Sequence, residues 1–317
     1  MRYPGQLNEA VAAWLDEQGG SLRAGAAAMT ARYGKGASSI GIDLAAYVAA
    51  RLPATHAVNL RVLGEVAGLL PDFAPQSLRD VGAGPGTAGW AALGVWPGIA
   101  QIEQVEASAP FRALAGHFNG ESGLAALAEA AVVAGDLRAL AGAEPRDLVV
   151  ASYVLAELPE AEAGELALRL WQGAKEVLVL VEPGSPQGFA RIRRARDALI
   201  KAGGHVAGPC THDLACPITG ADWCHFKERV QRSRAHMHAK GASVPFEDEP
   251  YSWLAVARMR AVRGAGRIIG PAAHTKAGLS LRVCADGSIA ERHIASRDKA
   301  TYKRLRKMAW GDSLPIG

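Results

Sequence analysis

The chain has 317 residues, 49% of them hydrophobic, and a net charge of +4 at neutral pH. This length and composition predict a soluble globular protein with one large domain or two, and no apolar run approaches the roughly 18–20 residues of a membrane span. Because the first residues, MRYPGQLNEA, resemble neither a secretory signal nor an organelle transit peptide, we expect a cytoplasmic bacterial protein that is monomeric and makes no membrane contact.

Residues 1–76 are predicted to form an N-terminal helical cap on the domain that follows. Apolar residues recur at spacings of three and four in 7–17, 44–52 and 56–70, which is the pattern of helices with one buried face. A Gly/Ser-rich break at 34–41 separates the first of these segments from the other two.

Residues 77–258 are predicted to form an α/β domain around a mainly parallel sheet, because short apolar runs alternate with helical segments. The expected strands are 78–82, 100–106, 131–135, 147–152, 176–182, 205–209 and 252–258. By analogy, seven strands in this order fit the Rossmann-like sheet of class I methyltransferases, whose last two strands form an antiparallel edge pair. The long connection between those two strands, an insertion at 208–250, includes a predicted basic helix over 228–241.

A glycine-rich loop follows the first strand, in LRDVGAGPGTA at 78–88. Gly82, Gly84 and Gly86 allow the backbone to turn sharply and to approach a ligand at a helix N-terminus. Dinucleotide-binding loops are similar, but the intervening Pro and Thr depart from their G-x-G-x-x-G pattern. Because Asp80 can also face an ammonium group, the loop favours S-adenosylmethionine.

Three further residues complete the predicted cofactor site at the ends of other strands. Glu106 ends the second strand, where a carboxylate can accept hydrogen bonds from ribose hydroxyls, and Asp136 follows the third strand, near the adenine amino group; either one alone could be a surface carboxylate. Ser152 ends the fourth strand, in ASYVLAELP, where amino-methylating enzymes often carry an [N/D]-P-P-[Y/F] turn. Since that turn is missing, the catalytic residues are unknown, and the sequence leaves open whether the protein is an active methyltransferase.

The four cysteines are predicted to form one ligand set. They are Cys210, Cys216, Cys224 and Cys284, separated by five, seven and fifty-nine residues. Thiolates gathered in this way hold zinc or an iron–sulfur cluster, and structural zinc sites usually use closely spaced C-x₂₋₄-C pairs. The open spacing favours a cluster, most simply [4Fe–4S], because its corners lie farther apart than the ligands of one ion. The alternatives are zinc, with His212 or His225 replacing one thiolate, two disulfides, or four unrelated buried thiols.

Residues 259–317 are predicted to form a basic β module and tail, with short strands in GRIIGP, LSLRVCA and IAERHIA. From Arg258 onward, 13 Lys and Arg against 4 Asp and Glu give an excess of +9, whereas the first 257 residues carry −5. A basic end indicates contact with a polyanion, although a solvated charged surface would look the same. The segment KRLRKMAW combines cations with an aromatic residue, which suits phosphate contacts and base stacking, unless the tryptophan is a core anchor. The predicted RNA-binding residues are Lys303, Arg304, Arg306, Lys307 and Trp310.

These motifs resemble the methyltransferase-like assembly factors of the mitochondrial small ribosomal subunit and their bacterial relatives. The resemblance extends through RLPATHA, DVGAGPGTA, VEPGSPQGF, GPCTHDLACP, DWCHF, PFEDEPYSWL and KMAWGD, between residues 51 and 312. It implies a class I S-adenosylmethionine fold, a [4Fe–4S] cluster on the four cysteines, and association with small-subunit ribosomal RNA.

Two functions are therefore compared. The first is an assembly factor of the small ribosomal subunit that binds S-adenosylmethionine and RNA without necessarily turning over. The second is an active rRNA methyltransferase. A weaker alternative is an RNA-binding protein that is stabilised by zinc or senses redox state through its cluster.

Overall fold

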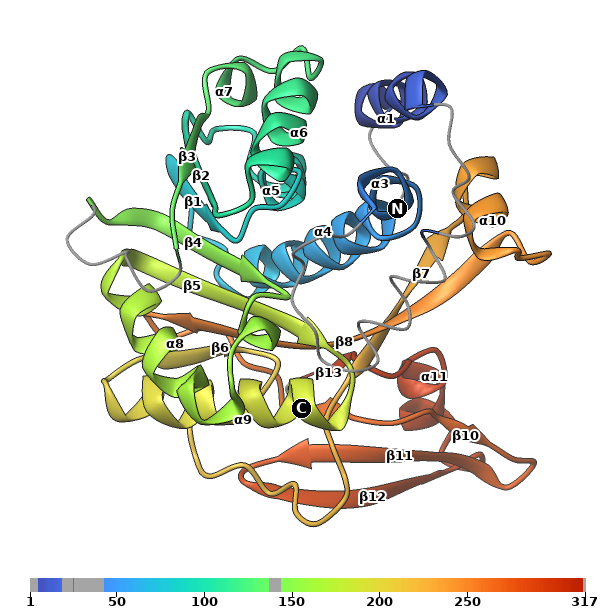
Figure 1. The fold of residues 1–317 in the computed structure, drawn as a ribbon. Helices are drawn as coiled ribbons and strands as arrows, with labels where there is room; N and C mark the ends of the chain where they lie inside the picture. Colours follow the sequence, from blue (N-terminus) through green and yellow to red (C-terminus); the bar gives the residue numbers. More distant parts are fainter. Residues whose placement is uncertain (1–4, 19–24, 26–42, 137–143, 316–317) are drawn as a thin grey trace.

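The computed structural model describes residues 5–18, 25, 43–136 and 144–315, which form two β-sheets with helices on both faces of the larger one (Figure 1). The predicted Gly/Ser break at 34–41 lies outside the described residues. No described helix combines the length and the apolar character needed to cross a bilayer.

The larger sheet has eight strands in the order β3-β2-β1-β4-β5-β8-β6, and β7 also pairs with β8. These strands are β1 (Ser77–Val81), β2 (Gln101–Glu106), β3 (Ala131–Ala134), β4 (Arg146–Ser152), β5 (Ala174–Pro183), β6 (His205–Gly208), β7 (Phe226–Gln231) and β8 (Phe246–Ala257). Strands β1 to β5 are parallel, whereas β8 is antiparallel to both β5 and β6. This arrangement confirms the predicted Rossmann-like class I methyltransferase fold with its antiparallel edge pair.

Helices cover both faces of the larger sheet, with α4 and α5 on one face and α8 and α9 on the other (Figure 1). The helices are α1 (Gly5–Gln18), α3 (Leu44–Ala50), α4 (Leu52–Leu69), α5 (Thr87–Val95), α6 (Ala109–Gly120), α7 (Ala125–Ala128), α8 (Ala163–Gln172), α9 (Pro186–Lys201), α10 (Arg234–Lys240) and α11 (Lys299–Leu305). Two short 3₁₀ turns, η1 (Leu155–Glu157) and η2 (Glu160–Glu162), precede α8. The predicted helical segments at 7–17, 44–52 and 56–70 correspond to α1, α3 and α4.

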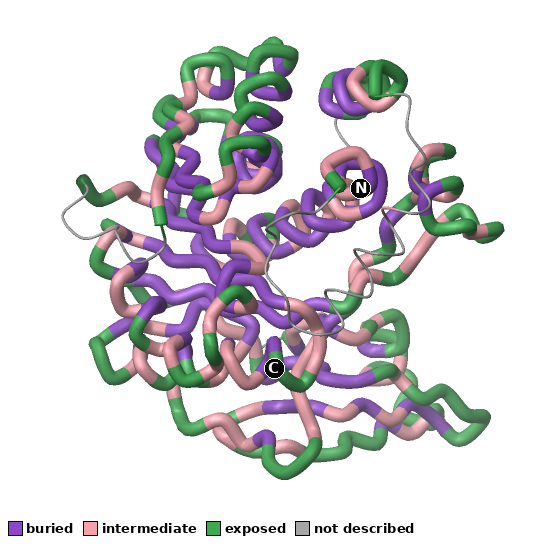
Figure 2. The backbone as a smooth tube through the Cα atoms, in the orientation of Figure 1, coloured by how far each residue is buried: buried purple, intermediate pink, exposed green. Residues whose placement is uncertain are grey.

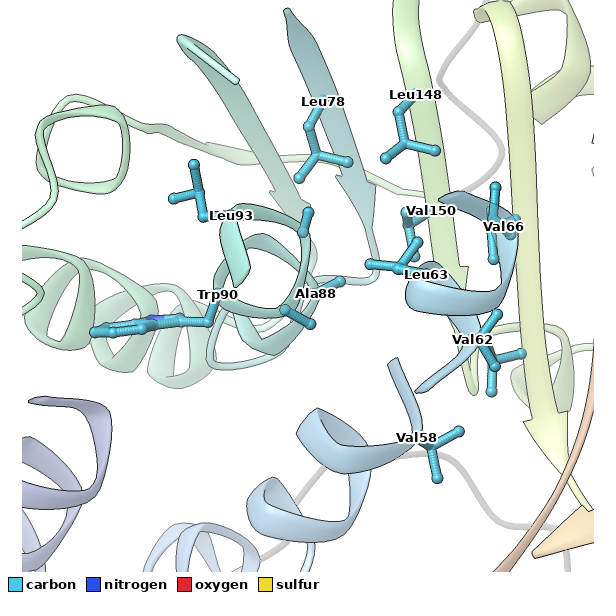
Figure 3. Packing of buried hydrophobic residues seen from close by; sticks show 14 of the residues in the cluster. Val58, Val62, Leu63, Val66, Leu78, Ala88, Trp90, Leu93, Leu148 and Val150 are labelled. Carbon is cyan, nitrogen blue, oxygen red and sulfur yellow. The ribbon is translucent and has the colours of Figure 1, made fainter. Parts of the chain in front are cut away.

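The alternation of side chains along each strand produces two separate hydrophobic cores. On β4, Leu148 and Val150 pack toward α4 and α5, while Val149 and Ala151 pack toward α8 and α9, as the period of two in a strand requires. Figure 3 shows the first of these cores, where side chains of α4, including Leu63, lie beside strands β1 and β4. Burial on both faces explains the continuous apolar run at residues 148–151 of β4.

A second, smaller sheet follows the large one in the chain. It contains five antiparallel strands: β9 (Gly266–Ile268), β10 (Ala273–His274), β11 (Gly278–Ala285), β12 (Ser288–Ala295) and β13 (Ser313–Leu314). Its core is formed by Ile268, Leu279, Leu281, Val283, Ile294, Leu305 and Leu314. In Figure 2 the buried residues concentrate along the larger sheet and α4, whereas much of β12 is exposed. The predicted short strands after residue 258 are thus present.

The prediction of a basic helix over 228–241 was wrong in its first half. Residues 226–231 form β7, which pairs with the first half of β8, and only Arg234–Lys240 is helical. Phe226 and Val230 are buried while Lys227 and Arg229 are exposed, which is the alternation of a strand. A spacing of four between two apolar residues fits a helix and a strand equally, so the charged residues between them misled the prediction.

Arg267 joins the small sheet to the rest of the molecule. Its guanidinium is buried, pairs with Glu65 of α4 at 2.8 Å, and donates to the carbonyl oxygens of Pro209 (2.8 Å) and Gly311 (2.5 Å). One side chain therefore ties together α4, the segment that contains the first cysteines, and the end of the chain.

Candidate functional site

The glycine loop joins the C-terminal end of β1 to the N-terminus of α5, at the edge where α/β sheets bind ligands. Gly82, Gly84 and Gly86 have φ values of 67°, 52° and 84°, a left-handed conformation that residues with a Cβ rarely adopt. A Cβ at Gly86 would lie 2.6 Å from Nε2 of the buried Gln104, whereas one at Gly84 would meet no described atom closer than the Tyr47 hydroxyl, 3.7 Å away. Gly86 is therefore required by packing, while the position of Gly84 leaves space for a ligand.

Asp80, on β1 just before this loop, is 2% exposed. Burial raises the pKa of its carboxyl to about 7, the nearby Glu106 adds to the rise, and backbone amides of Gly89 and Ala88 oppose it. The Oδ2 atom has no hydrogen-bond partner among the described residues. The Asp80 carboxylate thus accepts hydrogen bonds from backbone amides in the first turn of α5. Its Oδ2 is the atom to which the predicted ammonium group of the ligand would donate.

Glu106 lies at the end of β2, as predicted, and is almost fully buried. Its Oε2 accepts a hydrogen bond from the Gly84 amide at 2.9 Å, and its Oε1 accepts one from the Ser108 amide at 2.7 Å. The carboxylate therefore holds the glycine loop against the next strand. Each oxygen has a second lone pair that can accept another hydrogen bond. The contact with ribose hydroxyls remains a prediction.

Ser152 and Asp136 occupy different environments. Ser152 ends β4 and donates from Oγ to Oδ1 of Asn59 on α4 at 2.5 Å. Asp136 follows β3 and is exposed, and the residues directly after it lie outside the described part of the chain. Ser152 therefore lies at the C-terminal end of β4, at the same edge of the sheet as the glycine loop, whereas Asp136 follows β3, the edge strand.

A polar group at the same edge of the sheet was missed from the sequence. Tyr153, directly after β4, has a φ of 61° although it is not glycine, and such strained residues concentrate at functional sites. Its hydroxyl is buried without a described partner, and the Arg51 guanidinium, which pairs with Glu249 at 2.8 Å, lies 5.4 Å from its ring centroid. Nearby, burial raises the pKa of the Glu182 carboxyl to about 8. No local sequence signal marks a left-handed tyrosine.

The four cysteines lie around one cavity of about 40 Å³ between α9, the segment after β6, and the small sheet. They are Cys210, Cys216 and Cys224 from the insertion and Cys284 from β11. A cavity of roughly 10–15 Å³ on this measure holds one water molecule, so this one accommodates a group of several atoms. Among the described residues, no three His, Cys, Asp or Glu side chains converge closely enough to hold one metal ion.

The thiols influence one another's protonation. Burial raises the pKa of the Cys224 thiol well above its usual range, and the other three cysteines raise it further. The pKa of Cys284 rises to about 12, again mainly through burial. In the absence of a metal these thiols therefore keep their protons at neutral pH, and a metal that binds them must displace protons.

Two buried arginines line the same cavity and supply positive charge to it. Arg267 lowers the pKa of Cys224, and Arg196 lowers those of Cys216 and Cys284, in both cases against the larger effect of burial. A buried cation is costly unless a negative charge compensates it; Glu65 compensates Arg267, whereas Arg196 has only the largely exposed Asp197 beside it. Four cysteines, a cavity larger than one ion and the buried charge of Arg196 are chemically compatible with an anionic metal–thiolate centre, which remains a prediction.

The predicted RNA-binding cations lie on α11 and the turn after it. We call Lys303, Arg304, Arg306 and Lys307 the tail cations, and all four are exposed. Trp310 is half-buried instead: its ring centroid lies 4.6 Å from that of His225, and Lys227 Nζ lies 5.2 Å from it. Trp310 therefore packs beside β7 of the larger sheet, and its proposed stacking on a base would compete with this packing.

The chain matches the protein family described as mitochondrial small ribosomal subunit Rsm22 over residues 42–315. It is 28% identical over 292 residues to the human mitochondrial ribosome assembly protein METTL17, which is 85% of this chain and 62% of that protein. A mitochondrial Rsm22-cox11 tandem protein of Schizosaccharomyces pombe is 26% identical over 323 residues, 86% of this chain and 43% of that protein. The chain thus spans less than two thirds of the length of these relatives.

Solved methyltransferase structures show a more distant likeness. The magnesium protoporphyrin IX methyltransferase of Synechocystis with bound S-adenosylmethionine is 16% identical, with a TM-score of 0.42 over 65% of this chain and 81% of that one. The precorrin-6y C5,15-methyltransferase of Geobacter metallireducens is 14% identical, with a TM-score of 0.40 over 65% of this chain and 86% of that one.

Proposed function

The chain belongs to the family of the mitochondrial small ribosomal subunit protein Rsm22, and from this membership we propose that it is an assembly factor of the small ribosomal subunit. In this proposal it binds S-adenosylmethionine at the glycine loop, holds a [4Fe–4S] cluster on its four cysteines, and contacts small-subunit rRNA. The human relative is named a ribosome assembly protein, which supports the first part of the proposal.

The observation that carries the proposal is the single cavity shared by the four cysteines. Three of the cysteines come from the insertion and one from β11 of the small sheet, so a metal centre would cross-link the two sheets. Binding energy at such a site becomes folding energy. A cluster would therefore fix the orientation of the small sheet and, with it, the exposed tail cations.

Binding of S-adenosylmethionine is supported by the loop itself. The space at Gly84 and the Oδ2 of Asp80, which has no hydrogen-bond partner among the described residues, lie at the C-terminal edge of the parallel strands. Nucleotide-like ligands bind at this edge in this class of fold. The bound cofactor would then contribute either a transferable methyl group or, in an assembly factor, only the stability that any ligand confers on the folded state.

RNA contact is supported by the charge of the C-terminal part. The tail cations are exposed, and so are Arg292 on β12, Arg297 in the turn that follows it, and Lys299 at the start of α11. Cations in this density attract the phosphate backbone and make affinity strongly dependent on salt.

An active rRNA methyltransferase is the second candidate function. The strained Tyr153 favours it, because its buried hydroxyl has no hydrogen-bond partner in the described part of the chain and the residue follows β4 at the same edge of the sheet as the glycine loop. The bacterial cytoplasm remains the proposed location, since a reducing compartment keeps thiols available for metal; the named relatives are mitochondrial.

The test uses full-length protein purified without oxygen. We expect about four iron and four sulfide per chain, a broad absorption near roughly 400 nm from sulfur-to-iron charge transfer, and co-sedimentation with immature small subunits. Zinc without iron would refute the cluster, and a failure to co-sediment would refute the assembly role. Incubation with tritiated S-adenosylmethionine separates the two candidates, because label in the rRNA above trace level promotes the methyltransferase.

A matched pair of variants sharpens the RNA arm of this test. The first variant replaces all four tail cations with glutamine. The control replaces four cations on the α8–α9 side with glutamine, namely Arg169, Lys175, Arg194 and Lys201. Both variants lose the same charge, so only a specific tail interface makes the first bind immature subunits more weakly than the second.

A further inference from the structure

Arg196 is a charged residue on the buried face of α9. It follows Phe189 by seven residues and Ile192 by four, so helical geometry places all three on one side, and Arg196 is 3% exposed. Its Nη2 donates to the carbonyl oxygens of His212 at 2.9 Å and Leu214 at 2.7 Å. The guanidinium thereby fixes the segment between the first two cysteines.

The charge of Arg196 is poorly compensated by the protein. Its Nε has no hydrogen-bond partner among the described residues, and Asp197, 3.7 Å from Nη1, has a side chain that is 53% exposed. An exposed, hydrated carboxylate offsets a buried cation only weakly. Because Arg196 lines the cavity of the four cysteines, the missing negative charge points to thiolates bound to metal.

His212 approaches one of those cysteines directly. Its Nε2 lies 3.8 Å from Sγ of Cys284, and the residue is 5% exposed. The neighbouring Asp213 accepts hydrogen bonds from the Val206 amide at 2.8 Å and from Arg263 at 2.7 Å. With Arg196 holding its carbonyl, the imidazole is positioned by groups that need no metal.

We propose that His212 and Arg196 set the reduction potential of the cysteine centre: His212 donates a hydrogen bond from Nε2 to the Cys284 thiolate, and Arg196 balances the negative charge of the centre. This inference rests on the iron–sulfur cluster of the proposed function and assigns its outer shell. Both residues are positioning residues, because neither is required as a ligand.

The physical reason is charge. Four thiolates leave an iron–sulfur centre with a net negative charge, and its one-electron reduction adds another. Hydrogen bonds to sulfur and a nearby buried cation stabilise the reduced form more than the oxidised form, which raises the potential. Removing either contribution lowers the potential, even where the cluster and the fold persist.

His225 provides a matched control within the same insertion. It directly follows Cys224, but its ring stacks on Trp223 with centroids 5.2 Å apart and packs edge-on against Trp310. His225 is therefore a second histidine that lies next to a cysteine in the sequence, but its imidazole ring contacts aromatic side chains. His212→Leu, His212→Gln and His225→Leu form the test set, and Gln retains an N–H donor.

The experiment is a redox titration of full-length, anaerobically loaded protein with dithionite, followed by absorbance and electron paramagnetic resonance. His212→Leu is expected to lower the reduction equilibrium constant about tenfold, which is roughly 59 mV for one electron. His212→Gln should recover part of this change, and His225→Leu should match the wild type. Equal potentials for wild type and His212→Leu would overturn the proposal.

Two further outcomes are distinguishable. If His212→Leu does not retain a cluster, Arg196→Lys and Arg196→Met are compared, with Arg194→Met as the exposed control on the same helix. The proposal requires a lower potential in Arg196→Met than in Arg196→Lys, and equal potentials or loss of the cluster in both would refute it. If the wild type contains no iron and sulfide, the proposed iron–sulfur cluster is refuted, and so is the proposed effect of His212 and Arg196 on its reduction potential.

Discussion

Replacing Gly84 with aspartate should separate cofactor binding from folding. A Cβ at this position meets only ordinary contact with the Tyr47 hydroxyl, at 3.7 Å, so the main cost is the left-handed backbone. That cost is about 1 kcal/mol for aspartate, which tolerates this region better than most residues, or roughly 2–4 °C in melting temperature. The new carboxylate occupies the space left for the ligand, and affinity for S-adenosylmethionine should fall at least about tenfold, or roughly 1.4 kcal/mol.

Gly86→Ala is the contrasting variant. Its Cβ would approach Nε2 of Gln104 to 2.6 Å, and Gln104 is fully buried and bound to Asn119 at 2.8 Å. Overpacking of roughly 1–3 kcal/mol then adds to the backbone cost of about 1–2 kcal/mol. Calorimetric titration and urea unfolding on the same samples measure both effects. The reasoning is refuted if Gly84→Asp binds the cofactor as the wild type does; if the wild type binds none, the site is vestigial.

Three other predictions follow from the geometry. Cys224→Ser should abolish the absorption near roughly 400 nm and make the small sheet after residue 258 sensitive to protease, while the larger sheet, which includes β8, stays folded; a resistant small sheet would contradict this. Removing the four tail cations should flatten the dependence of log affinity on log salt by about three units on single-stranded RNA, whereas Trp310→Ala should cost about 1–3 kcal/mol in binding without a change in slope if a base stacks there. Because the folded Asp80 carboxyl has a pKa of about 7 against an ordinary 3.8, the protein without ligand should lose stability as pH rises from about 4 to 7. Over the same range the affinity for the cationic cofactor should increase, and Asp80→Asn should remove that increase.

Most strands of the larger sheet could be predicted from the sequence because they contain short runs of apolar residues. β4 and β5 are buried on both faces along their central residues and therefore contain uninterrupted apolar runs at 148–151 and 177–181, and their predicted and observed bounds differ by a few residues. β8 was predicted only from residue 252, although it begins at Phe246. Its first half carries Glu247, which pairs with Arg232 and Lys240 of the preceding segment, and Glu249, which pairs with Arg51, 198 residues away. The pair with Arg51 joins positions too far apart to leave a local pattern in the sequence.

In the candidate metal site, too, some residues could be predicted from the sequence and others could not. The cysteines could be grouped from the sequence because every cysteine in the chain belongs to the set. Arg196 could not be found as readily, since it lies in the run RIRRAR, where Arg194 is exposed and pairs with Glu160. Only the helical spacing from Phe189 places Arg196 on the buried face. The contact of His212 with Cys284 joins residues 72 positions apart, a distance that sequence spacing alone does not bridge.

The strand order also fixes when the cysteine site can be completed during synthesis. β6, which precedes the first three cysteines, lies at the edge of the larger sheet and takes β8 as its neighbour. While the chain emerges from the ribosome, β1 to β5 can pair in sequence, but β6 must wait until residue 257 has been made. Cys284 arrives later still, and the ion pair of Arg267 with Glu65 closes a separation of 202 residues. The proposed cluster could therefore be completed only after Cys284 has been made, and until then the first three cysteines lack their fourth partner.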